Sequence, residues 1–535
     1  MRIIVLSGKI GVGKSTLCDL LVVQADAKVV KTRQLIEAVA ADRDGKGFVP
    51  GRTSLQDLGE QLDRETGGTW VADALDAFLK QHDRDALVVV DSVRIQAQID
   101  ELRARYGLVV YHIHLTADDD VVANRYSERA KKFPELASYE EARRNTTEAN
   151  VEQLSAKADA LIDTTHCTAD DVWIRAATHL HLFPRNYDRL VDVVVGGQFG
   201  SEGKGHIASF LAREYAVLVR VGGPNAGHSV FEKPEPFIHH QLPCGTRNTK
   251  AELVIAPGAT LSLEKLLGEI KDCGVGPDRL KIDGQAMIIS DDDIRAEEVL
   301  KATISSTGQG VGAATARRIM GRGAETKLAR DFPELQPFIC NSGEVLEAAY
   351  RGGKKILVEG TQGTGLSLYH GSYPHVTSRD TTVAGCLSEA GISPTRLRKV
   401  VMVCRTYPIR VANATEGTSG PLSQEIGWDI VAAQSGISVE ILEAKEVTST
   451  TGRRRRVASF DWVQLRRAAS LNGPTDIALT FVDYLDPVNK DARRFEQLSS
   501  STIHFIEEVE NVAGAPVSLI STRFGFRSIL DRRSW

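Results

Sequence analysis

Twice along this 535-residue chain, a short apolar strand runs into a glycine-rich loop and then into a helix. The first instance covers residues 2–22 (RIIVLSGKIGVGKSTLCDLLV), and the second covers residues 193–211 (VVVGGQFGSEGKGHIASFL). Backbone N–H groups at such a helix start can cradle phosphate, and the strand before the loop belongs to a parallel sheet. Two beginnings of this kind predict two nucleotide-handling domains, 1–183 and 188–535, that join near residues 181–188.

The hydrophobic pattern supports this division. In the first 165 residues, short apolar runs such as ALVVVDS, LVVYHIHL and DALIDTT alternate with polar helical stretches. This alternation is typical of a parallel sheet covered by helices. It starts again at LVDVVVGG and continues to Trp535 with long glycine-rich loops. We expect an α/β fold in both domains, the larger one with a central, mostly parallel sheet.

Composition excludes several classes of partner. The formal net charge of −5 gives no electrostatic case for nucleic acid or a membrane surface, and only the RRRR run at 453–456 needs its own explanation. No window approaches the about 18 uninterrupted apolar residues of a membrane span, and the N-terminus lacks the pattern of a signal peptide. Seven scattered cysteines without a CxxC pair indicate a reducing compartment. We therefore expect a soluble, cytoplasmic protein.

The first loop satisfies GxxxxGK[ST] in the strand, loop and helix context that the motif requires. In such a loop the lysine neutralises the β and γ oxygens of a nucleotide, and the hydroxyl after it completes the coordination of Mg²⁺. The predicted phosphate-binding residues are Gly8, Gly11, Gly13, Lys14, Ser15 and Thr16, with Ser15 as the Mg²⁺ ligand.

Three more residues of the first domain have a predicted role. Asp91 ends the strand VVVDS, where a water-mediated contact to Mg²⁺ is expected. Arg125 and Arg129 lie four apart on one helical face, and they either clamp transferring phosphates or form an ordinary solvated basic face. The loop, the domain length and these arginines resemble P-loop nucleoside and deoxynucleoside monophosphate kinases. The resemblance implies a nucleotide kinase activity but no particular acceptor.

The second loop differs from the first because Gly205 follows Lys204, so the hydroxyl that binds Mg²⁺ in a P-loop is missing. Three later segments accompany it: RVGGPNAGHSV (220–230), EGTQGTGLSLYHGSYPHVTS (359–378) and TSTTGRRRRVASFDW (448–462). Taken together in this order, the loop and these segments resemble adenylosuccinate synthetase across essentially all of 190–535. The length matches the shorter members of that family.

The resemblance implies a two-step ligation. A nucleoside triphosphate phosphorylates the 6-oxygen of a purine nucleoside monophosphate, and the amino group of L-aspartate then displaces phosphate. His228 would stabilise the 6-oxygen, Lys204 would meet the triphosphate, and the Gly227 carbonyl would bind Mg²⁺.

The resemblance also assigns groups of residues and implies a homodimer. The catalytic group is His228, Ser201, Glu202, Lys204 and Gln362. The monophosphate group is Asn225, Thr307, Gln362 and Thr377, with Arg318 or Arg322 reaching across the dimer interface. The donor group is Gly200, Gly203, Lys204, Gly205 and Asp483. The group for the carboxylates of aspartate is Thr450, Thr451, Arg453 and Arg455. This last role explains the arginine run better than nucleic-acid binding does, because guanidinium forks suit bidentate pairing.

Ser201 departs from the family pattern, which has an aspartate here to take the proton from the ring nitrogen beside the 6-oxygen. A serine hydroxyl is not appreciably ionised at neutral pH and cannot act as that base. It does leave space for the 2-amino group of guanine, and phage enzymes of this family that act on dGMP also carry a small residue here. Either the reaction is lost, or a (d)GMP-type substrate is favoured over IMP or dIMP.

The donor segment departs as well. The family has TKxD where this chain has TFVD at 480–483, so Asp483 is kept while Phe481 replaces the lysine. ISTRFGF at 520–526 lacks the Gly-Pro that follows the threonine in the family. The donor is therefore open among ATP, dATP and GTP. VGAATARRIMGRG at 311–323 lacks the proline and acidic residues of the family, so the cross-subunit arginine rests on position alone.

Two hypotheses of different class remain. In the first, the chain is a bifunctional enzyme in which a nucleotide kinase is fused to a ligase. In the second, the synthetase-like domain is catalytically silent and senses nucleotides for the kinase. The intact TTGRRRR loop favours the enzyme, because a sensor has no need of a site for the carboxylates of aspartate.

Overall fold

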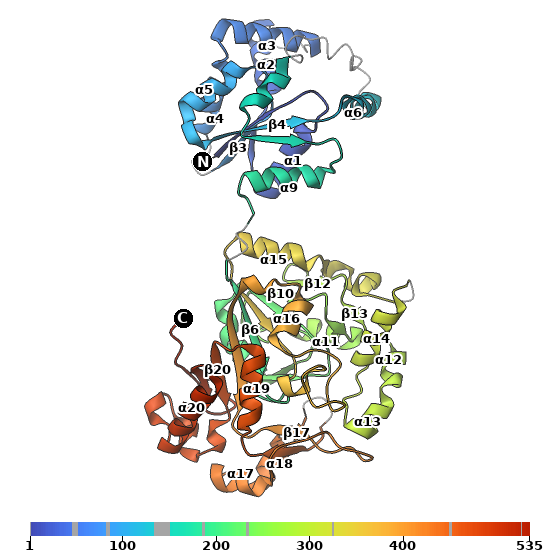
Figure 1. Ribbon diagram of the computed structural model, residues 1–535, viewed down its shortest axis with the longest axis vertical. Helices are drawn as coiled ribbons and strands as arrows, with labels where there is room; N and C mark the ends of the chain where they lie inside the picture. The colour runs from blue at the N-terminus through green and yellow to red at the C-terminus, as the bar shows by residue number, and fades with distance from the viewer. Residues whose placement is uncertain are drawn as a thin grey trace. The chain divides into compact units, whose positions relative to one another are not determined.

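The computed structural model describes residues 2–44, 52–81, 86–132, 150–183, 188–231, 235–323, 326–448, 452–525 and 527–535. The chain forms two compact units, Met1–Phe183 and Pro184–Trp535, and each is described here by itself (Figure 1).

The N-terminal unit is built on a five-stranded sheet in the order β2-β3-β1-β4-β5, in which all neighbours are parallel. Its strands are β1 (Arg2–Ser7), β2 (Lys28–Val30), β3 (Leu87–Val90), β4 (Val110–Thr116) and β5 (Ala160–Asp163). Because β1 is the central strand, the loop after it opens at the middle of the carboxyl edge. The predicted parallel α/β fold is confirmed for this unit.

Alternation along the strands divides the N-terminal core into two layers. Ile4 and Leu6 pack with helices α1 (Lys14–Ala25) and α9 (Ala169–His179). Ile3 and Val5, which point to the other face, pack with the remaining layer of helices, α4 (Trp70–Leu79) and α5 (Gln96–Tyr106). The unit also contains α2 (Thr32–Asp44), α3 (Arg52–Thr66) and α6 (Asp119–Lys132).

The C-terminal unit contains a ten-stranded sheet in the order β14-β12-β10-β7-β15-β6-β16-β20-β21-β22. Only the pairing of β21 with β22 is antiparallel, so the prediction of a mostly parallel sheet is confirmed. The strands are β6 (Val191–Gly196), β7 (Val217–Arg220), β10 (Glu252–Ile255), β12 (Leu280–Asp283), β14 (Ile339–Cys340), β15 (Ile356–Glu359), β16 (Leu397–Arg405), β20 (Asp476–Thr480), β21 (Val517–Ser521) and β22 (Ile529–Asp531).

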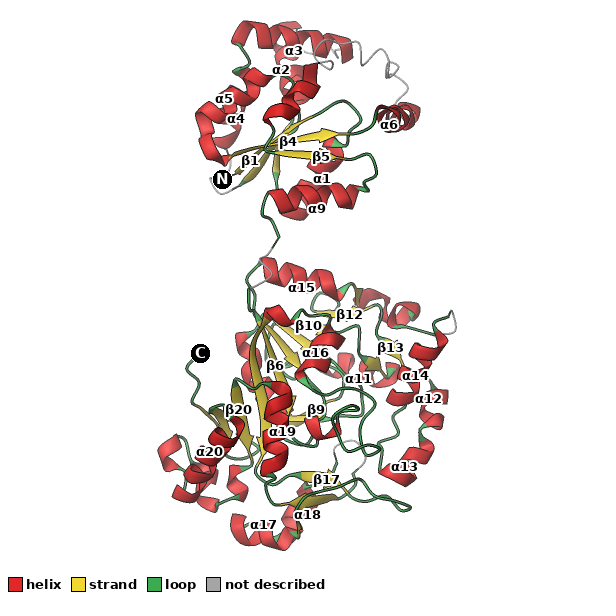
Figure 2. Cartoon of the chain, in the orientation of Figure 1, coloured by secondary structure: helices red, strands yellow, loops and turns green. Residues whose placement is uncertain are grey.

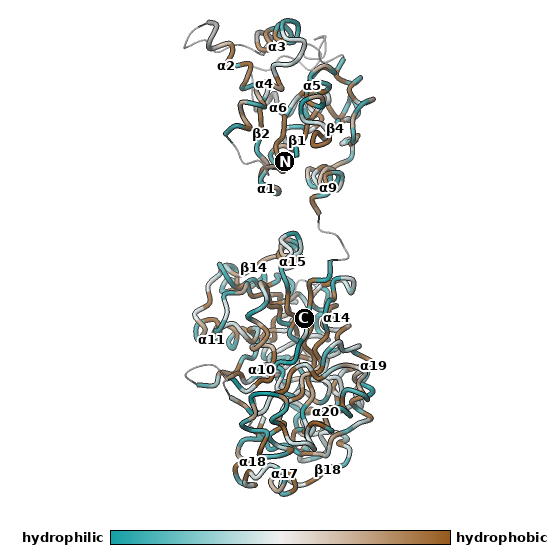
Figure 3. Tube along the Cα trace, turned by 90° about the vertical axis from the view of Figure 1, so that its left-hand side faces the viewer, coloured by the Kyte–Doolittle hydropathy of each residue, from teal (hydrophilic) through white to brown (hydrophobic). Residues whose placement is uncertain are grey.

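Helices cover both faces of this sheet (Figure 2). Val193 and Val195 of β6 pack on one face with α15 (Ser342–Arg351), α16 (Val383–Ala390), α19 (Trp462–Asn472) and α20 (Ser500–Ala513). Val194 points to the opposite face, where it packs with α10 (Lys204–Leu211) and α11 (Leu263–Cys273). The central strands are therefore buried on both sides, and the hydrophobic stretches of the trace run through the interior of the unit (Figure 3).

Smaller elements surround the carboxyl edge. The hairpin of β8 (His228–Phe231) and β9 (Pro236–His239) follows the β7 loop, and β17 (Ile409–Val411), β19 (Arg455–Ala458) and β18 (Glu425–Ile426) form an antiparallel sheet. The remaining elements are β11 (Thr260–Leu261), β13 (Met287–Ile288), α12 (Asp291–Ala296), α13 (Glu298–Ile304), α14 (Val311–Gly321), α17 (Trp428–Ser435) and α18 (Val439–Lys445). Within the described ranges, no helix combines the length and the apolar character that crossing a bilayer requires.

Candidate active site at the carboxyl edge of the larger sheet

The site residues gather where five neighbouring strands end. These neighbours lie in the order β7-β15-β6-β16-β20. The middle strand, β6, runs into the second glycine-rich loop, and the other four end, in that order, in Arg220, Glu359, Arg405 and Thr480. In open α/β sheets, ligands bind in the crevice beyond the carboxyl ends of the strands. The sheet order thus brings together segments that lie far apart in the sequence.

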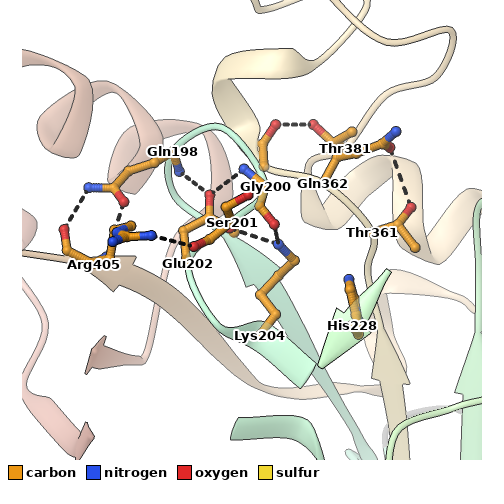
Figure 4. A network of polar contacts seen from close by, with 12 residues as sticks. Gln198, Gly200, Ser201, Glu202, Lys204, His228, Thr361, Gln362, Thr381 and Arg405 are labelled. Carbon is orange, nitrogen blue, oxygen red and sulfur yellow. Dashed lines mark hydrogen bonds and ion pairs between the residues drawn. The ribbon is translucent and has the colours of Figure 1, made fainter. Parts of the chain in front are cut away.

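The loop after β6 is shaped by Glu202, which is buried beneath it (Figure 4). Glu202 Oε1 accepts the backbone N–H groups of Gln198 (3.0 Å) and Gly200 (2.8 Å). Glu202 Oε2 pairs with Lys204 Nζ at 2.7 Å, and the same ammonium donates to the Gly200 carbonyl at 3.0 Å. Gly203, the residue before α10, lies in the left-handed region with a φ of 84°. The loop thus keeps a buried lysine, neutralised by a carboxylate, at the start of a helix.

Ser201 lies at the tip of this loop and is partly buried. Its carbonyl accepts from Arg405 Nη1 at 3.3 Å, and the next carbonyl, that of Glu202, accepts from the Thr480 hydroxyl at 2.7 Å. A Cβ atom on Gly200 would lie only 3.0 Å from Gln362 Cα. The loop tip is therefore held between the ends of β16 and β20 and the segment that follows β15.

His228 begins β8 and is buried beside the ends of β7 and β15. Its Nδ1 contacts Glu359 Oε1 and lies 2.8 Å from Arg220 Nη1, which also donates to Glu359 Oε1 at 2.5 Å. Nε2, also buried, has no hydrogen-bond partner among the described residues. Burial and the neighbouring Arg220 lower the pKa of His228 to about 3, although Glu359 acts in the opposite direction. The imidazole is therefore neutral at neutral pH.

The two partners of Nδ1 require different tautomers, because a guanidinium can only donate and a carboxylate can only accept. The closer contact is with Glu359, which places the proton on Nδ1 and leaves a lone pair on Nε2. An anionic oxygen brought next to Nε2 would raise the pKa of His228 and favour a proton there. His228, held by Glu359, can therefore supply a proton from Nε2 to an oxygen on which negative charge develops.

Three residues of the predicted monophosphate group meet at one hydroxyl. Thr377 Oγ1 lies 2.9 Å from Gln362 Nε2 and 3.5 Å from Asn225 Nδ2. Gln362 has a φ of 60°, a strained conformation for a residue with a side chain. Asn225 Oδ1 is buried without a hydrogen-bond partner within the described part of the chain. These amides and the hydroxyl are thus available to a polar ligand.

The predicted aspartate group is described in part. Thr450 and Thr451 lie outside the described residues. Arg453 Nη2 donates to the carbonyls of Ser305 (3.2 Å) and Ser306 (2.8 Å), which precede Thr307. Arg455 Nη1 donates to Glu446 Oε2 at 3.0 Å. The arginine loop therefore joins the Thr307 segment on one side and a buried carboxylate on the other.

The arginines of α14 make contacts inside their own chain. Arg318 Nη1 donates to the carbonyls of Pro257 (3.1 Å) and Gln285 (2.7 Å), and Arg322 Nε donates to the Ile319 carbonyl at 3.0 Å. Arg317 pairs with Asp293. The role of Arg318 or Arg322 across a subunit interface stays a prediction.

The segment after β20 lies against the glycine-rich loop. A Cβ atom on Gly203 would lie 3.8 Å from the Phe481 ring and 3.6 Å from the Thr480 methyl group. Asp483 is buried, its Oδ1 has no hydrogen-bond partner among the described residues, and burial raises its pKa to about 7. The Phe481 ring therefore lies next to the predicted triphosphate site, and a carboxyl group with one unpaired oxygen follows it two residues later.

The first glycine-rich loop has the geometry that its motif predicts. Gly8, Gly11 and Gly13 all have positive φ, and Gly13 precedes α1. Lys14 Nζ donates to the Lys9 carbonyl at 2.7 Å, and Ser15 and Thr16 are exposed at the helix start.

The other predicted residues of the N-terminal unit are held by neighbouring threonines. Asp91 accepts from the Thr32 hydroxyl at 3.0 Å and its N–H at 2.9 Å, and Arg125 donates to Thr164 Oγ1 at 3.0 Å and to the Thr164 carbonyl at 2.8 Å. The side chain of Arg129 lies outside the described part of the chain.

Sequence reasoning missed several charged residues of the larger site. Arg220 and Glu359, which hold His228, and Arg405 and Glu446, which hold Ser201 and Arg455, were assigned no role. For Arg220, Glu359 and Arg405 the available signal was a charged residue at the end of an apolar strand, as in VLVR and ILVE, whereas Glu446 follows a helix and had no such signal. Charges are costly to bury, so such positions indicate a functional edge.

Comparison with known proteins gives matches for both units. The family model described as adenylosuccinate synthetase matches residues 193–330 and 326–490, and a model described as an AAA domain matches residues 4–146. The adenylosuccinate synthetase of Thermococcus onnurineus (strain NA1) is 38% identical over 350 residues, which cover 64% of this chain and 98% of that protein. That of Methanocaldococcus jannaschii is 36% identical over 351 residues, which cover 64% of this chain and 96% of that protein.

Two solved structures are similar to the C-terminal unit. The fully ligated adenylosuccinate synthetase from Plasmodium falciparum has a TM-score of 0.57 at 21% identity and covers 64% of this chain and 100% of its own, which supports the fold. The succinoaminodeoxyadenylate synthetase of cyanophage S-2L, bound to dGMP and dATP as an energy donor, has a TM-score of 0.54 at 26% identity. The match covers 65% of this chain and 96% of that one.

Gly222 packs closely against the side chains of Thr361 and Arg379. Gly222 has a φ of +90°, and a Cβ atom there would lie 2.1 Å from Thr361 Oγ1 and 2.5 Å from Arg379 Nη1. We expect Gly222→Ala to lower the free energy of unfolding by about 1 kcal/mol from the positive φ and by about 1–3 kcal/mol more from the collision. It should also weaken nucleotide binding, because Thr361 precedes Gln362. Denaturant unfolding and nucleotide titration measure both effects.

Gly274→Ala is the matched control. Gly274 has a φ of +60°, but nothing in the described chain lies within 4 Å of an added Cβ atom. This variant should show only the smaller loss of stability and normal nucleotide binding. Equal effects of the two substitutions would contradict the close packing at Gly222.

Proposed function

The chain belongs to the adenylosuccinate synthetase family through residues 193–490 and carries a ligase of that type, and we propose that its nucleotide substrate is (d)GMP. One observation carries the choice of substrate: Ser201, at the tip of the phosphate loop, offers no carboxylate. The net reaction joins the amino group of L-aspartate to C6 of the purine. It converts the donor triphosphate to its diphosphate and inorganic phosphate.

Space at position 201 supports a guanine base. In guanine a 2-amino group stands beside ring nitrogen N1, where a longer carboxylate would crowd it, while a serine hydroxyl can accept a hydrogen bond from it. The loop has little freedom to retreat, because Glu202 binds the N–H groups of Gln198 and Gly200 and Thr480 binds the Glu202 carbonyl. The similar synthetase of cyanophage S-2L, which is bound to dGMP, supports the same substrate class.

The residues of the site divide the chemistry. The 6-oxygen is a poor leaving group until it accepts the γ-phosphoryl group. In that step the N1 proton passes to solvent water, because Ser201 is no base, and the negative charge left on the diphosphate lies next to Lys204. His228, protonated at Nε2 when the phosphoryl anion lies beside it, donates to the oxygen as its charge develops. The amino group of aspartate then attacks C6 and phosphate leaves. Arg453 and Arg455 would receive the carboxylates of aspartate.

We propose an adenine nucleotide, ATP or dATP, as the donor. Asp483, with a pKa raised by burial to about 7, is partly protonated at neutral pH. A protonated carboxyl group can donate to N1 of adenine and accept from its 6-amino group, whereas guanine offers two donors and needs the ionised form. Phe481 offers an apolar ring beside the loop in place of the lysine of the family. The dATP bound to the cyanophage relative agrees with this choice.

Oxygen donors for Mg²⁺ are present in both units. Hard cations take oxygen ligands, which fit the exposed Ser15 hydroxyl and, in the larger site, the Gly227 carbonyl two residues after Asn225. Because Ser201 supplies no carboxylate, phosphate oxygens would complete the second set. A bound ion would neutralise charge on the transferring phosphoryl group.

For the N-terminal unit we propose phosphoryl transfer to a nucleoside monophosphate. The left-handed glycines around Lys14 support nucleotide binding, and the match to an AAA domain model agrees with it. Chains of this kind would act as homodimers on small molecules, with no nucleic acid as partner.

The substrate proposal is tested by a matrix of reactions. The purified chain is incubated with aspartate, Mg²⁺ and each of IMP, dIMP, GMP and dGMP, with ATP, dATP or GTP as donor, and the succinylated product is detected by mass. We expect kcat/KM for a guanine nucleotide to exceed that for IMP and dIMP by about 10-fold or more, the range that one misplaced group produces. A chain that uses only IMP or dIMP would contradict the role of Ser201.

Two variants separate size from charge at position 201. Ser201→Asp should lower the preference for guanine over hypoxanthine by about 10-fold, since it crowds the 2-amino group and restores a base. Ser201→Asn has the same size without the charge, so it should lose activity with GMP and gain none with IMP. Unchanged selectivity in both variants would refute the steric explanation.

The two lysines give a test of bifunctionality. Lys14→Ala should lower phosphoryl transfer to a monophosphate by about 10²-fold or more and leave ligation intact, because each lysine neutralises charge in its own unit. Lys204→Ala should do the reverse. Both rates are followed by mass detection of the products, with circular dichroism to verify folding. Loss of both activities in either variant would argue against independent sites.

Glu359→Gln tests the state of His228 through the pH dependence. Glu359 raises the pKa of His228, so its removal lowers that pKa, and the protonated form is lost at a lower pH as the pH rises. We expect kcat to fall by about 10–100-fold and the alkaline limb of its pH profile to move to lower pH.

Glu269→Gln is the control for this variant. Glu269 is another buried glutamate, but it accepts only backbone N–H groups of residues 240–242 in the contacts described. It should lower stability without moving the pH profile. A profile that is the same in wild type and Glu359→Gln would show that Glu359 does not act through His228.

A further inference from the structure

Arg405 is a fully buried arginine that ends β16 and contacts two of the site's loops. Its backbone exchanges two hydrogen bonds of 3.0 Å with the Gln198 side chain. Its Nη1 donates to the Ser201 carbonyl at 3.3 Å, and its guanidinium carbon lies 4.0 Å from the centre of the Phe481 ring. Arg405 therefore supports both the phosphate loop (Figure 4) and the ring proposed to face the donor base.

Glu446 connects this arginine to the aspartate loop. Its two oxygens accept from Arg405 Nη2 (2.9 Å), the Tyr484 hydroxyl (2.9 Å) and Arg455 Nη1 (3.0 Å). Burial alone would raise the pKa of Glu446, but the guanidiniums of Arg405 and Arg455 lower it to about 2. One buried carboxylate thus pairs with two arginines, each of which contacts a different substrate site.

We propose that Arg405 and Glu446 are positioning residues that couple donor binding to aspartate binding. The proposal rests on the proposed function, since it takes Phe481 as part of the donor site and Arg455 as part of the aspartate site. Neither Arg405 nor Glu446 needs to touch a substrate. Each acts through the residue it holds.

The shared charge is the physical basis of the coupling. Two guanidiniums face the carboxylate of Glu446 and the carboxyl group of Asp483, whose pKa is raised by burial to about 7, so an excess of positive charge stays in a poorly solvated place where charges interact strongly. A carboxylate of aspartate on Arg455 supplies the missing negative charge and frees Glu446 to pair more fully with Arg405. Arg405 in turn holds Phe481 and the loop carbonyl of Ser201 in the arrangement that the donor uses. By linkage, the donor must strengthen aspartate binding by the same factor.

The same strand offers a matched control at its opposite end. Arg398 of β16 donates to Asp192 at 2.9 Å, and the Tyr215 hydroxyl donates to the same buried carboxylate. Tyr215→Phe and Tyr484→Phe therefore remove the same kind of contact, a hydroxyl bound to a carboxylate that pairs with an arginine of β16. Only Tyr484 belongs to the group that joins the two sites.

The test uses equilibrium dialysis of labelled aspartate with the full chain and GMP, with and without a non-hydrolysable ATP analogue. We expect the analogue to tighten aspartate binding by about 5-fold or more in wild type, the lower end of ordinary coupling. The ratio should fall toward 1 in Tyr484→Phe and Glu446→Gln and partly in Arg405→Lys, and it should keep its wild-type value in Tyr215→Phe. Loss of folding stability alone does not change this ratio.

Three outcomes would overturn the proposal: a wild-type ratio of 1, a wild-type ratio retained in Tyr484→Phe and Glu446→Gln, or an equal loss in Tyr215→Phe. Ligation with intact kinetics but no coupling would refute the coupling while leaving the proposed function standing. A wild-type chain that neither ligates nor binds aspartate would refute both. The reciprocal measurement, binding of the analogue with and without aspartate, must give the same factor.

Discussion

Buried charge at the carboxyl edge of the ten-stranded sheet is the constraint on which the larger unit depends. Arg220 and Glu359 meet at His228, Lys204 meets Glu202 inside the loop, and Arg405 meets Glu446. An unpaired charge in such a place costs several kcal/mol, so β7 and β15 must pair with Arg220 opposite Glu359, and the loops must bring Lys204 to Glu202 and Glu446 to Arg405. The stacked apolar faces of β6 and its neighbours fix that register. The hydrophobic core therefore positions the chemistry, and the ion pairs allow the charged edge to stay buried.

Much of the architecture could be predicted because it follows from the pattern of residues within short segments of the sequence. Strand, glycine loop and helix follow each other within about twenty residues, and hydrophobic runs of strand length mark parallel sheets. The grouping of Asn225, Gln362 and Thr377 came from the resemblance rather than from spacing, and the structure adds that the two amides contact the Thr377 hydroxyl. Glu359 was visible only as a charged residue at the end of an apolar strand, and Glu446 had no such signal, so the partners that define their roles could not be found in this way. Their partners lie in strands and loops that become neighbours only through the sheet order, which local pattern does not encode.

Glu202 illustrates a second limit. The resemblance placed it in the catalytic group, next to Ser201. In the structure its oxygens are occupied by two backbone N–H groups and by Lys204, so it shapes the loop and balances the lysine. The identity of a residue in a motif predicts that the residue lies in the site. The role follows only when the partners of each oxygen are known.

The serine at position 201 also changes the charge balance of its surroundings. A carboxylate at this position would add a negative charge to the loop whose Ser201 carbonyl accepts from Arg405 at 3.3 Å, and Arg405 pairs with Glu446. Without it, Glu446 serves Arg405 and Arg455 together, and the region between the two loops keeps an excess of positive charge. Phosphates and the two carboxylates of aspartate are suited to such a region. The serine that makes room for the amino group of guanine thus also makes the site depend more strongly on its anionic substrates for charge neutrality. The residue that selects the purine is therefore linked to the coupling between the donor and aspartate.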